Sequence, residues 1–368
     1  SAMVSAPKPP CGKRVVAIGG CIAQRDGEKI REHIPTADVV FGTSALASLP
    51  GLLEEAFADY GKSVEVDTLE EGRGFSCDLP SRRAQKFHAW VPIMTGCNNF
   101  CTYCIVPYVR GREKSRTIEA VAGECKKLVA DGVREITLLG QNVNSYGRNI
   151  YGEPKFAELL REISTTGIER VRFTSSNPHD LTDETISAMA ELPCVMPHLH
   201  LAVQSGSTRV LKAMNRKYTR EQYLGLVGRL KAAMPDLALS TDIIVGFPGE
   251  TEEDFKDTLS LVKEAAFSSA YTFIYSPRPG TPAAKIVDDT PHEVIQDRFD
   301  RLADLVAEQA HDANQGDLGK TVSVLVEGSS KRDDSVMVGH SEKMRTVHFS
   351  LPDGADPEDY VGKICNVK

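Results

Sequence analysis

The sequence contains no apolar run long enough to cross a bilayer and no stretch built like a signal peptide. We therefore expect a cytoplasmic protein that is not bound to a membrane. An excess of positive charge is also missing, because the net charge is −8. This balance argues against a wholly basic nucleic-acid coat but is compatible with a local basic patch. The nine cysteines do not belong to a small secreted scaffold, so they indicate a reducing compartment and metal chemistry.

The composition is that of an ordinary globular protein, with 41% hydrophobic and 26% charged residues. A length of 368 residues predicts two or three domains. Both ends look trimmed, since residues 1–3 resemble an expression scar and residues 363–368 alternate like a strand that stops midway. We expect this sequence to be part of a longer protein.

A fourth cysteine is missing from the most informative motif. Cys97, Cys101 and Cys104 form a CxxxCxxC loop directly after the apolar run 90–94. Zinc sites usually pair CxxC knuckles and close with four ligands, so zinc, with His88 as a candidate fourth ligand, is the weaker interpretation. A cluster of four irons bound by three thiolates keeps one iron open for another ligand. The loop therefore predicts a reactive iron–sulfur site.

The cysteine spacing, with the aromatic residue Tyr103 just before the third cysteine, resembles the signature of the radical S-adenosylmethionine enzymes. The resemblance implies a 4Fe-4S cluster on Cys97, Cys101 and Cys104. It also implies that the open iron chelates the amino and carboxylate groups of S-adenosylmethionine.

Strands and helices alternate along most of the chain, which predicts an α/β fold. Residues 15–42 follow the pattern strand, helix, strand, as in a doubly wound parallel sheet, and a polar linker follows at 70–86. Six further strands alternate with helices such as 118–129, 221–233 and 252–265, which predicts an open or partial parallel (β/α) barrel. The predicted barrel strands are 91–95, 135–139, 170–174, 199–203, 239–245 and 271–275.

A helix at 291–310 closes the predicted barrel, and the pattern changes to a period of two after Gly319. Short alternating strands with glycine-rich turns indicate a small β-barrel. We thus expect an N-terminal domain at 1–80, a barrel domain at 81–315 and a small C-terminal domain at 316–368.

Four polar loops follow the predicted barrel strands. Glycine, asparagine, proline and serine also make ordinary turns, but turns alone do not require so many hydrogen-bonding side chains. In barrels of this kind the chemistry lies at the C-terminal ends of the strands. Gln204 and Asp242 suit the hydroxyls and the amine of S-adenosylmethionine, and Glu250 is equally well a helix cap or a ligand. The expected cofactor contacts are Tyr103, Gln141, Ser175, Gln204, Asp242, Gly246 and Gly249.

A basic run follows the cysteine loop and places four cations within seven residues. A charge run is usually a solvated face, but its position beside the predicted site favours contact with the phosphates of a nucleic acid. The expected RNA contacts are Arg110, Arg112, Lys114 and Arg116.

Longer stretches resemble the radical S-adenosylmethionine methylthiotransferases, namely 97–111, 138–146, 200–207 and 273–283. Within that family, the loop 140–144 is most similar to the enzymes that act on isopentenylated adenosine in tRNA. The resemblance implies an N-terminal methylthiotransferase domain, a radical S-adenosylmethionine domain and a C-terminal β-barrel, the TRAM domain, that holds RNA. Both outer domains are expected to be incomplete here.

The family's N-terminal domain holds a second, auxiliary 4Fe-4S cluster through three cysteines. Only Cys21 matches one of them, and a lone cysteine cannot hold that cluster. Cys11 and Cys77 lack the flanking pattern, so we interpret both as incidental.

The resemblance also implies the reaction and the partners. A 5′-deoxyadenosyl radical takes a hydrogen from carbon 2 of the adenine next to the anticodon, and a methylthio group replaces that hydrogen. The expected partners are the tRNA substrate and an electron donor such as a flavodoxin, and the protein is expected to be a monomer. Two alternatives stay open: a methylthiotransferase acting on threonylcarbamoyl-adenosine in tRNA, and a non-catalytic, zinc-dependent RNA-binding module.

Overall fold

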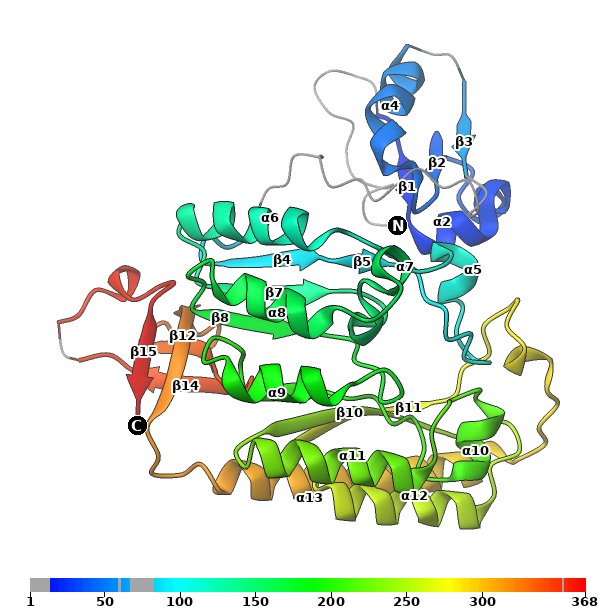
Figure 1. Cartoon of the computed structure of the whole chain (residues 1–368). Helices are drawn as coiled ribbons and strands as arrows, with labels where there is room; N and C mark the ends of the chain where they lie inside the picture. Colours follow the sequence, from blue (N-terminus) through cyan, green and yellow to red (C-terminus); the bar gives the residue numbers. More distant parts are fainter. Residues whose placement is uncertain (1–13, 59–60, 67–82, 353) are drawn as a thin grey trace. The chain divides into compact units, whose positions relative to one another are not determined.

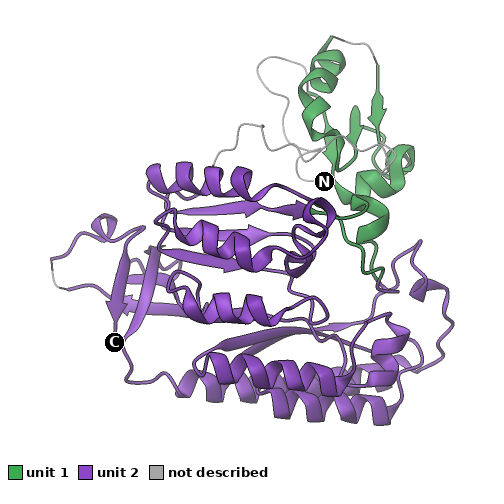
Figure 2. Cartoon of the chain, viewed as in Figure 1, with its two compact units in different colours: residues 1–82, 95–100, 104–114 green, residues 83–94, 101–103, 115–368 purple. Residues whose placement is uncertain are grey.

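The computed structural model describes residues 14–58, 61–66, 83–352 and 354–368. Contacts divide the chain into two compact units (Figure 2). The first unit contains residues 1–82, 95–100 and 104–114, and the second contains the remaining residues up to Lys368. No helix among the described residues is long and apolar enough to cross a membrane.

The first unit has a small parallel sheet in the order β1-β2-β3. Its apolar core forms where Ala23 and Ile30, from the helical segment, pack with Val40 of the central strand. This agrees with the strand–helix–strand pattern predicted for residues 15–42. The elements are β1 (Ala17–Gly19), α2 (Cys21–Asp26), η1 (Gly27–Lys29), α3 (Ile30–His33), β2 (Val39–Phe41), η2 (Ala45–Ser48), α4 (Leu49–Phe57), β3 (Ser63–Glu65) and α5 (Val106–Arg110).

The second unit contains six parallel strands that follow one another in space in chain order. One parallel sheet is β4-β7-β8 and the other is β9-β10-β11, and the parallel bridge between Ser176 and Leu201 links them. All four residues of β8 are buried, as expected for a parallel strand covered on both faces. The strands are β4 (His88–Pro92), β7 (Glu135–Leu139), β8 (Arg170–Phe173), β9 (His198–His200), β10 (Ala238–Val245) and β11 (Ser269–Ile274). The short strands β5 (Met94–Thr95) and β6 (Lys114–Ser115) lie where the chain passes between the units.

Helices cover the strands of the second unit, and α11, α12 and α13 lie along the side of β10 and β11 (Figure 1). The starts of α11 and α12 follow from the sequence, because Thr219 and Thr251 each form a capping box with the third residue of the following helix. The helices are α6 (Ile118–Ala130), η3 (Val143–Ser145), α7 (Arg148–Tyr151), α8 (Phe156–Ser164), α9 (Asp183–Glu191), α10 (Thr208–Ala213), α11 (Arg220–Ala233), α12 (Glu252–Ala265), η4 (Ala283–Lys285) and α13 (His292–Gln315).

A four-stranded antiparallel sheet in the order β14-β13-β12-β15 ends the second unit. Two buried arginines of β8 bind its backbone: Arg170 donates to the carbonyl of Ser323 at 2.8 Å, and Arg172 donates to that of Ser341 at 2.7 Å. These bonds attach the sheet to β8. Its elements are β12 (Val322–Ser329), β13 (Val336–Ser341), β14 (Thr346–Ser350), η5 (Pro357–Asp359) and β15 (Ile364–Val367).

The prediction of an α/β fold is confirmed, with differences at the element ends. Helix α13 continues to Gln315 rather than 310, and β9 stops at His200 rather than 203. Beyond His200 the hydroxyl of Thr241 replaces the backbone ladder, because it accepts from the N–H of Val203 at 2.9 Å and donates to the carbonyl of Leu201 at 2.9 Å. Most of the predicted linker, together with Cys11 and Cys77, lies outside the described residues.

Candidate functional site

The first part of the cysteine loop is bound to the basic run within the first unit. The backbone N–H of Cys97 donates to the carbonyl of Gly111 at 3.1 Å. The buried Glu113 accepts from the backbone N–H of Asn98 at 3.2 Å. Gly96 has φ +78°, and an added Cβ would lie 2.1 Å from the carbonyl oxygen of Arg112. Only glycine therefore lets the two segments approach so closely.

The middle of the loop is held within the second unit. Cys101 is buried, with 8% of its surface exposed. The next residue, Thr102, donates its backbone N–H to the carbonyl of Met214 at 3.0 Å and its hydroxyl to that of Ala213 at 2.9 Å. These bonds fix Cys101 against the end of α10.

Arg216 contacts the sulfur of Cys101, with Nη1 3.5 Å from Sγ. Burial lowers the pKa of Arg216, but Tyr218, Tyr103 and Cys101 together raise it well above its ordinary value, so the guanidinium is charged. Arg216 is not among the residues expected from the sequence. It lies 115 residues from Cys101, and no short-range pattern links the two.

The donor set fits an iron–sulfur cluster. Three thiols lie within eight residues, and none of them is in a disulfide. Among the described residues, no three His, Cys, Asp or Glu side chains converge to hold a single metal ion. In a cluster each thiolate binds a different iron, so convergence on one point is not required. His88, the candidate fourth zinc ligand, instead bonds the hydroxyl of Thr137 at 3.1 Å.

Two of the expected cofactor residues have unusual backbones. Ser175 lies two residues after the end of β8 with φ +62°, and Gln204 lies four residues after the end of β9 with φ +72°. An L-residue in this left-handed region is strained, and such strain gathers at functional sites. Ladder bonds hold Gln204 there, because its N–H donates to the carbonyl of Asp242 and its carbonyl accepts from Ile244.

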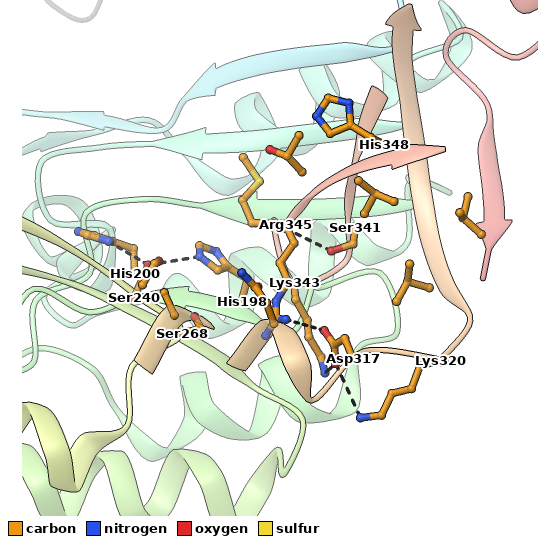
Figure 3. Close-up of a pocket in the computed structure, with 18 of the residues that line it drawn as sticks. His198, His200, Ser240, Ser268, Asp317, Lys320, Ser341, Lys343, Arg345 and His348 are labelled. Atoms are coloured by element: carbon orange, nitrogen blue, oxygen red, sulfur yellow. Dashed lines mark hydrogen bonds and ion pairs between the residues drawn. The ribbon is translucent and has the colours of Figure 1, made fainter. Parts of the chain in front are cut away.

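Asp242, a third expected contact, lies inside β10 and ends a chain of hydrogen bonds. His200 Nε2 lies 3.2 Å from its carboxylate, and His200 Nδ1 lies 3.1 Å from the hydroxyl of Ser240. The same hydroxyl lies 3.2 Å from Nε2 of His198 (Figure 3). Burial lowers the pKa of His198 to about 4. This series of hydrogen bonds holds the side chain of Asp242 in place at the wall of a cavity of about 970 Å³.

Gly246 and Gly249 form a tight turn after β10, with φ +70° and +81°. The buried Glu250 folds back, and its carboxylate accepts from the N–H of Gly246 at 2.8 Å. Burial raises the pKa of Glu250 to about 7, although Gly246 and Arg298 oppose this rise. Glu250 therefore closes the turn, while Thr251 caps α12.

The loops after β7 and β8 contain buried polar atoms with no hydrogen-bond partner among the described residues. Asn142 donates to Asp180 at 2.7 Å, and Asn144 accepts from the N–H of Asn177 at 3.0 Å. In each of these two amides one polar atom is hydrogen-bonded, and the other has no partner among the described residues. The unmatched atoms here are Oε1 of Gln141, Oδ1 of Asn142, Nδ2 of Asn144 and Oγ of Ser176. Buried groups of this kind fit a polar ligand.

Tyr103 is half-buried and packs in a small apolar cluster with Met214 and Phe247. The ring of Phe247 meets that of Tyr275 edge-on at 5.4 Å. Tyr103 therefore lies among residues that follow β9, β10 and β11, the strands whose ends carry the other expected contacts.

The basic run separates into exposed and buried members. Arg110 and Arg112 are exposed, and the guanidinium of Arg112 lies 4.4 Å from the ring centre of Phe100. Arg116 differs from the expectation of a phosphate contact, because it is buried and pairs with Glu124 at 2.6 Å. Lys114 is half-buried in β6.

Cys21 begins α2 in the first unit, and the Nε of Arg110 donates to its sulfur at 3.4 Å. A cation therefore accompanies this thiol, as Arg216 accompanies Cys101 in the second unit.

Comparisons with known sequences give a consistent result. The model of the Radical SAM superfamily matches residues 91–262. The chain is 49% identical over 344 residues to tRNA-2-methylthio-N(6)-dimethylallyladenosine synthase of Kineococcus radiotolerans, covering 92% of this chain and 67% of that protein. Proteins of the same name match from Acidothermus cellulolyticus, at 50% identity over 94% of this chain and 70% of the relative, and from Carboxydothermus hydrogenoformans, at 48% over 96% and 80%.

Among solved structures, the cobalamin-dependent S-adenosylmethionine radical enzyme OxsB has a similar fold. The TM-score is 0.52 at 13% sequence identity, and the match covers 80% of this chain and 43% of that chain. At this identity the likeness concerns the fold alone.

Proposed function

The chain belongs to the tRNA-2-methylthio-N(6)-dimethylallyladenosine synthases of the radical S-adenosylmethionine superfamily, and from this premise we propose the chemistry of its site. The proposed reaction replaces the hydrogen on carbon 2 of an isopentenylated adenosine in tRNA by a methylthio group. The observation that carries the proposal is the CxxxCxxC loop in a chain about 49% identical to enzymes of that name.

In this proposal Cys97, Cys101 and Cys104 hold the 4Fe-4S cluster, and Cys21 is one ligand of an auxiliary cluster. The cluster and S-adenosylmethionine together supply a radical able to remove a hydrogen that no side chain could abstract. The residues of the chain bind S-adenosylmethionine and orient it. The proposed cofactor contacts are Tyr103, Gln141, Ser175, Gln204, Asp242, Gly246 and Gly249, supported by the strained backbones, the unmatched polar atoms and the fixed carboxylate described above.

We further propose three functional segments: 1–80 as a methylthiotransferase domain, 81–315 as a partial (β/α) barrel and 316–368 as part of a TRAM domain. The six parallel strands and the terminal antiparallel sheet support the last two. Arg110, Arg112 and Lys114 are the proposed RNA contacts, whereas the ion pair of Arg116 gives that residue a structural role. An electron donor such as a flavodoxin, a monomeric state and a cytoplasmic location complete the proposal.

The test is an anaerobic incubation of the iron-reconstituted protein with isopentenylated tRNA, S-adenosylmethionine, sulfide and a strong reductant. Mass spectrometry measures 5′-deoxyadenosine and the 2-methylthio nucleoside. Both products support the proposal, and 5′-deoxyadenosine alone supports only its radical half. A brown iron-containing protein that forms neither product overturns the catalytic proposal, and a colourless zinc protein favours the RNA-binding alternative. Parallel reactions with tRNA carrying threonylcarbamoyl-adenosine test the other alternative.

A further inference from the structure

One guanidinium in the second unit points at a cluster cysteine. The Nη1 of Arg216 lies 3.5 Å from Sγ of the buried Cys101, within the range of an N–H···S hydrogen bond. The contact comes from the segment after α10, which follows β9.

The position of Arg216 is fixed by its other bonds. Its Nε donates to the hydroxyl of Tyr218 at 2.8 Å, and its Nη2 donates to the carbonyl of Ala202 at 2.8 Å. The hydroxyl of Tyr218 in turn donates to the carbonyl of Val203 at 2.9 Å. Asn215 turns the chain here with φ +58°. A planar guanidinium held on two sides has little freedom to turn away from the sulfur.

The charge of Arg216 is not matched by a carboxylate among the described residues, since its bonds go to neutral oxygens and the sulfur. Other arginines of this unit have such partners: Arg172 lies 2.9 Å from Glu135, and Arg298 lies 3.3 Å from Glu252. A half-buried cation without an anion is unfavourable, so the site suits a negatively charged group at Cys101.

We propose that Arg216 raises the reduction potential of the cluster by donating a charge-assisted hydrogen bond to the sulfur of Cys101. Reduction adds one electron from the external donor, and the added negative charge is stabilised by the nearby cation. Hydrogen bonds to cluster sulfurs and local charge are known determinants of such potentials. This inference rests on the proposed cluster.

The experiment compares wild-type protein with R216M and R216K after anaerobic reconstitution with iron and sulfide. Dithionite is added stepwise to set a series of potentials, without S-adenosylmethionine. At each potential EPR measures the amount of reduced cluster. A triple C97A/C101A/C104A variant identifies the signal. The matched control is R220M, because Arg220 is also partly buried but bonds Ser260, the carbonyl of Asp257 and the carboxylate of Glu264.

At a fixed potential we expect the ratio of reduced to oxidised cluster to fall about tenfold in R216M. For a one-electron couple that ratio corresponds to a shift of about 59 mV to lower potential. R216K is expected to fall between R216M and the wild type, and R220M to match the wild type. If R216M does not fold, Y218F tests the same contact, because it removes the hydroxyl that accepts from Nε of Arg216. We expect Y218F to shift the reduction potential in the same direction by a smaller amount.

Unchanged potentials in both R216M and R216K would overturn the inference, as would an equal shift in R220M. If S-adenosylmethionine binding weakens while the potential stays constant, Arg216 acts on the cofactor carboxylate and the inference is wrong. Failure of the proposed function looks different: the wild-type protein would then bind no cluster, and the triple variant would have the same iron content.

Discussion

The left-handed backbone of Gln204 allows a direct test of strain at the proposed cofactor site. With φ +72° this residue occupies a conformation that glycine adopts readily and other residues do not. Q204A and Q204G both remove the amide side chain, and they differ by one methyl group and by the freedom of the backbone. Comparing these two variants separates the backbone strain from the loss of the amide contacts.

The expected magnitude follows from two opposing terms. A left-handed L-residue costs about 1–2 kcal/mol. Glycine in place of alanine at an ordinary position costs about 0.5–1 kcal/mol through the greater freedom of the unfolded chain. Q204G should therefore be more stable than Q204A by about 1 kcal/mol, which raises the melting temperature by about 2–4 °C for a unit of this size.

The assay is thermal and urea unfolding of both variants followed by circular dichroism. S175A and S175G repeat the comparison at φ +62°, and A238G in β10 is the control. Because Ala238 does not have a positive φ, its change to glycine should lower stability by about 1 kcal/mol. If Q204A equals or exceeds Q204G in stability, the strain at this strand end is absent and the reasoning is refuted.

Three further predictions concern other parts of the site. G96A should abolish cluster loading, because its Cβ would collide with the carbonyl of Arg112; iron content per chain measures this, and normal iron would contradict it. Burial raises the pKa of Glu250 from 4.5 to about 7, so its stabilising effect is complete below pH 4.5 and is lost as the pH rises through 7. Between pH 4.5 and pH 7 the free energy of unfolding of the wild-type protein should fall by about 3 kcal/mol relative to that of E250Q. Parallel curves of unfolding free energy against pH for the two proteins would exclude this. R172M should destabilise the protein by about 3–5 kcal/mol, because it removes the nearer partner of the buried Glu135 and two bonds to the terminal sheet; urea unfolding measures this, and a loss below 1 kcal/mol would contradict it.

The cysteine loop shows what can be predicted from residues close together in the sequence. Spacing and flanking residues identify Cys97, Cys101 and Cys104 as candidate ligands, because thiolates so close in sequence have few other uses. The alternation of strands and helices likewise predicts β7, β10, α6 and α12 nearly to their ends, since periodicity and capping residues act over a few positions.

Tertiary structure decides what depends on residues far apart in the chain. The contact of Arg216 with Cys101 arises because the segment after α10 packs against the cysteine loop. The left-handed backbone of Gln204 is likewise held by hydrogen bonds to Asp242 and Ile244 of β10. Arg116 shows the reverse case: its sequence context predicts an exposed cation, and packing against α6 buries it beside Glu124.

The sequence by itself thus determines the family, the donor set and the order of elements, because each depends on residue types at short spacing. Only the fold decides which cation faces which sulfur, which carboxylate a histidine contacts and which buried amide atoms have no partner among the described residues. Those properties depend on burial and direction, and both are set when distant strands come together.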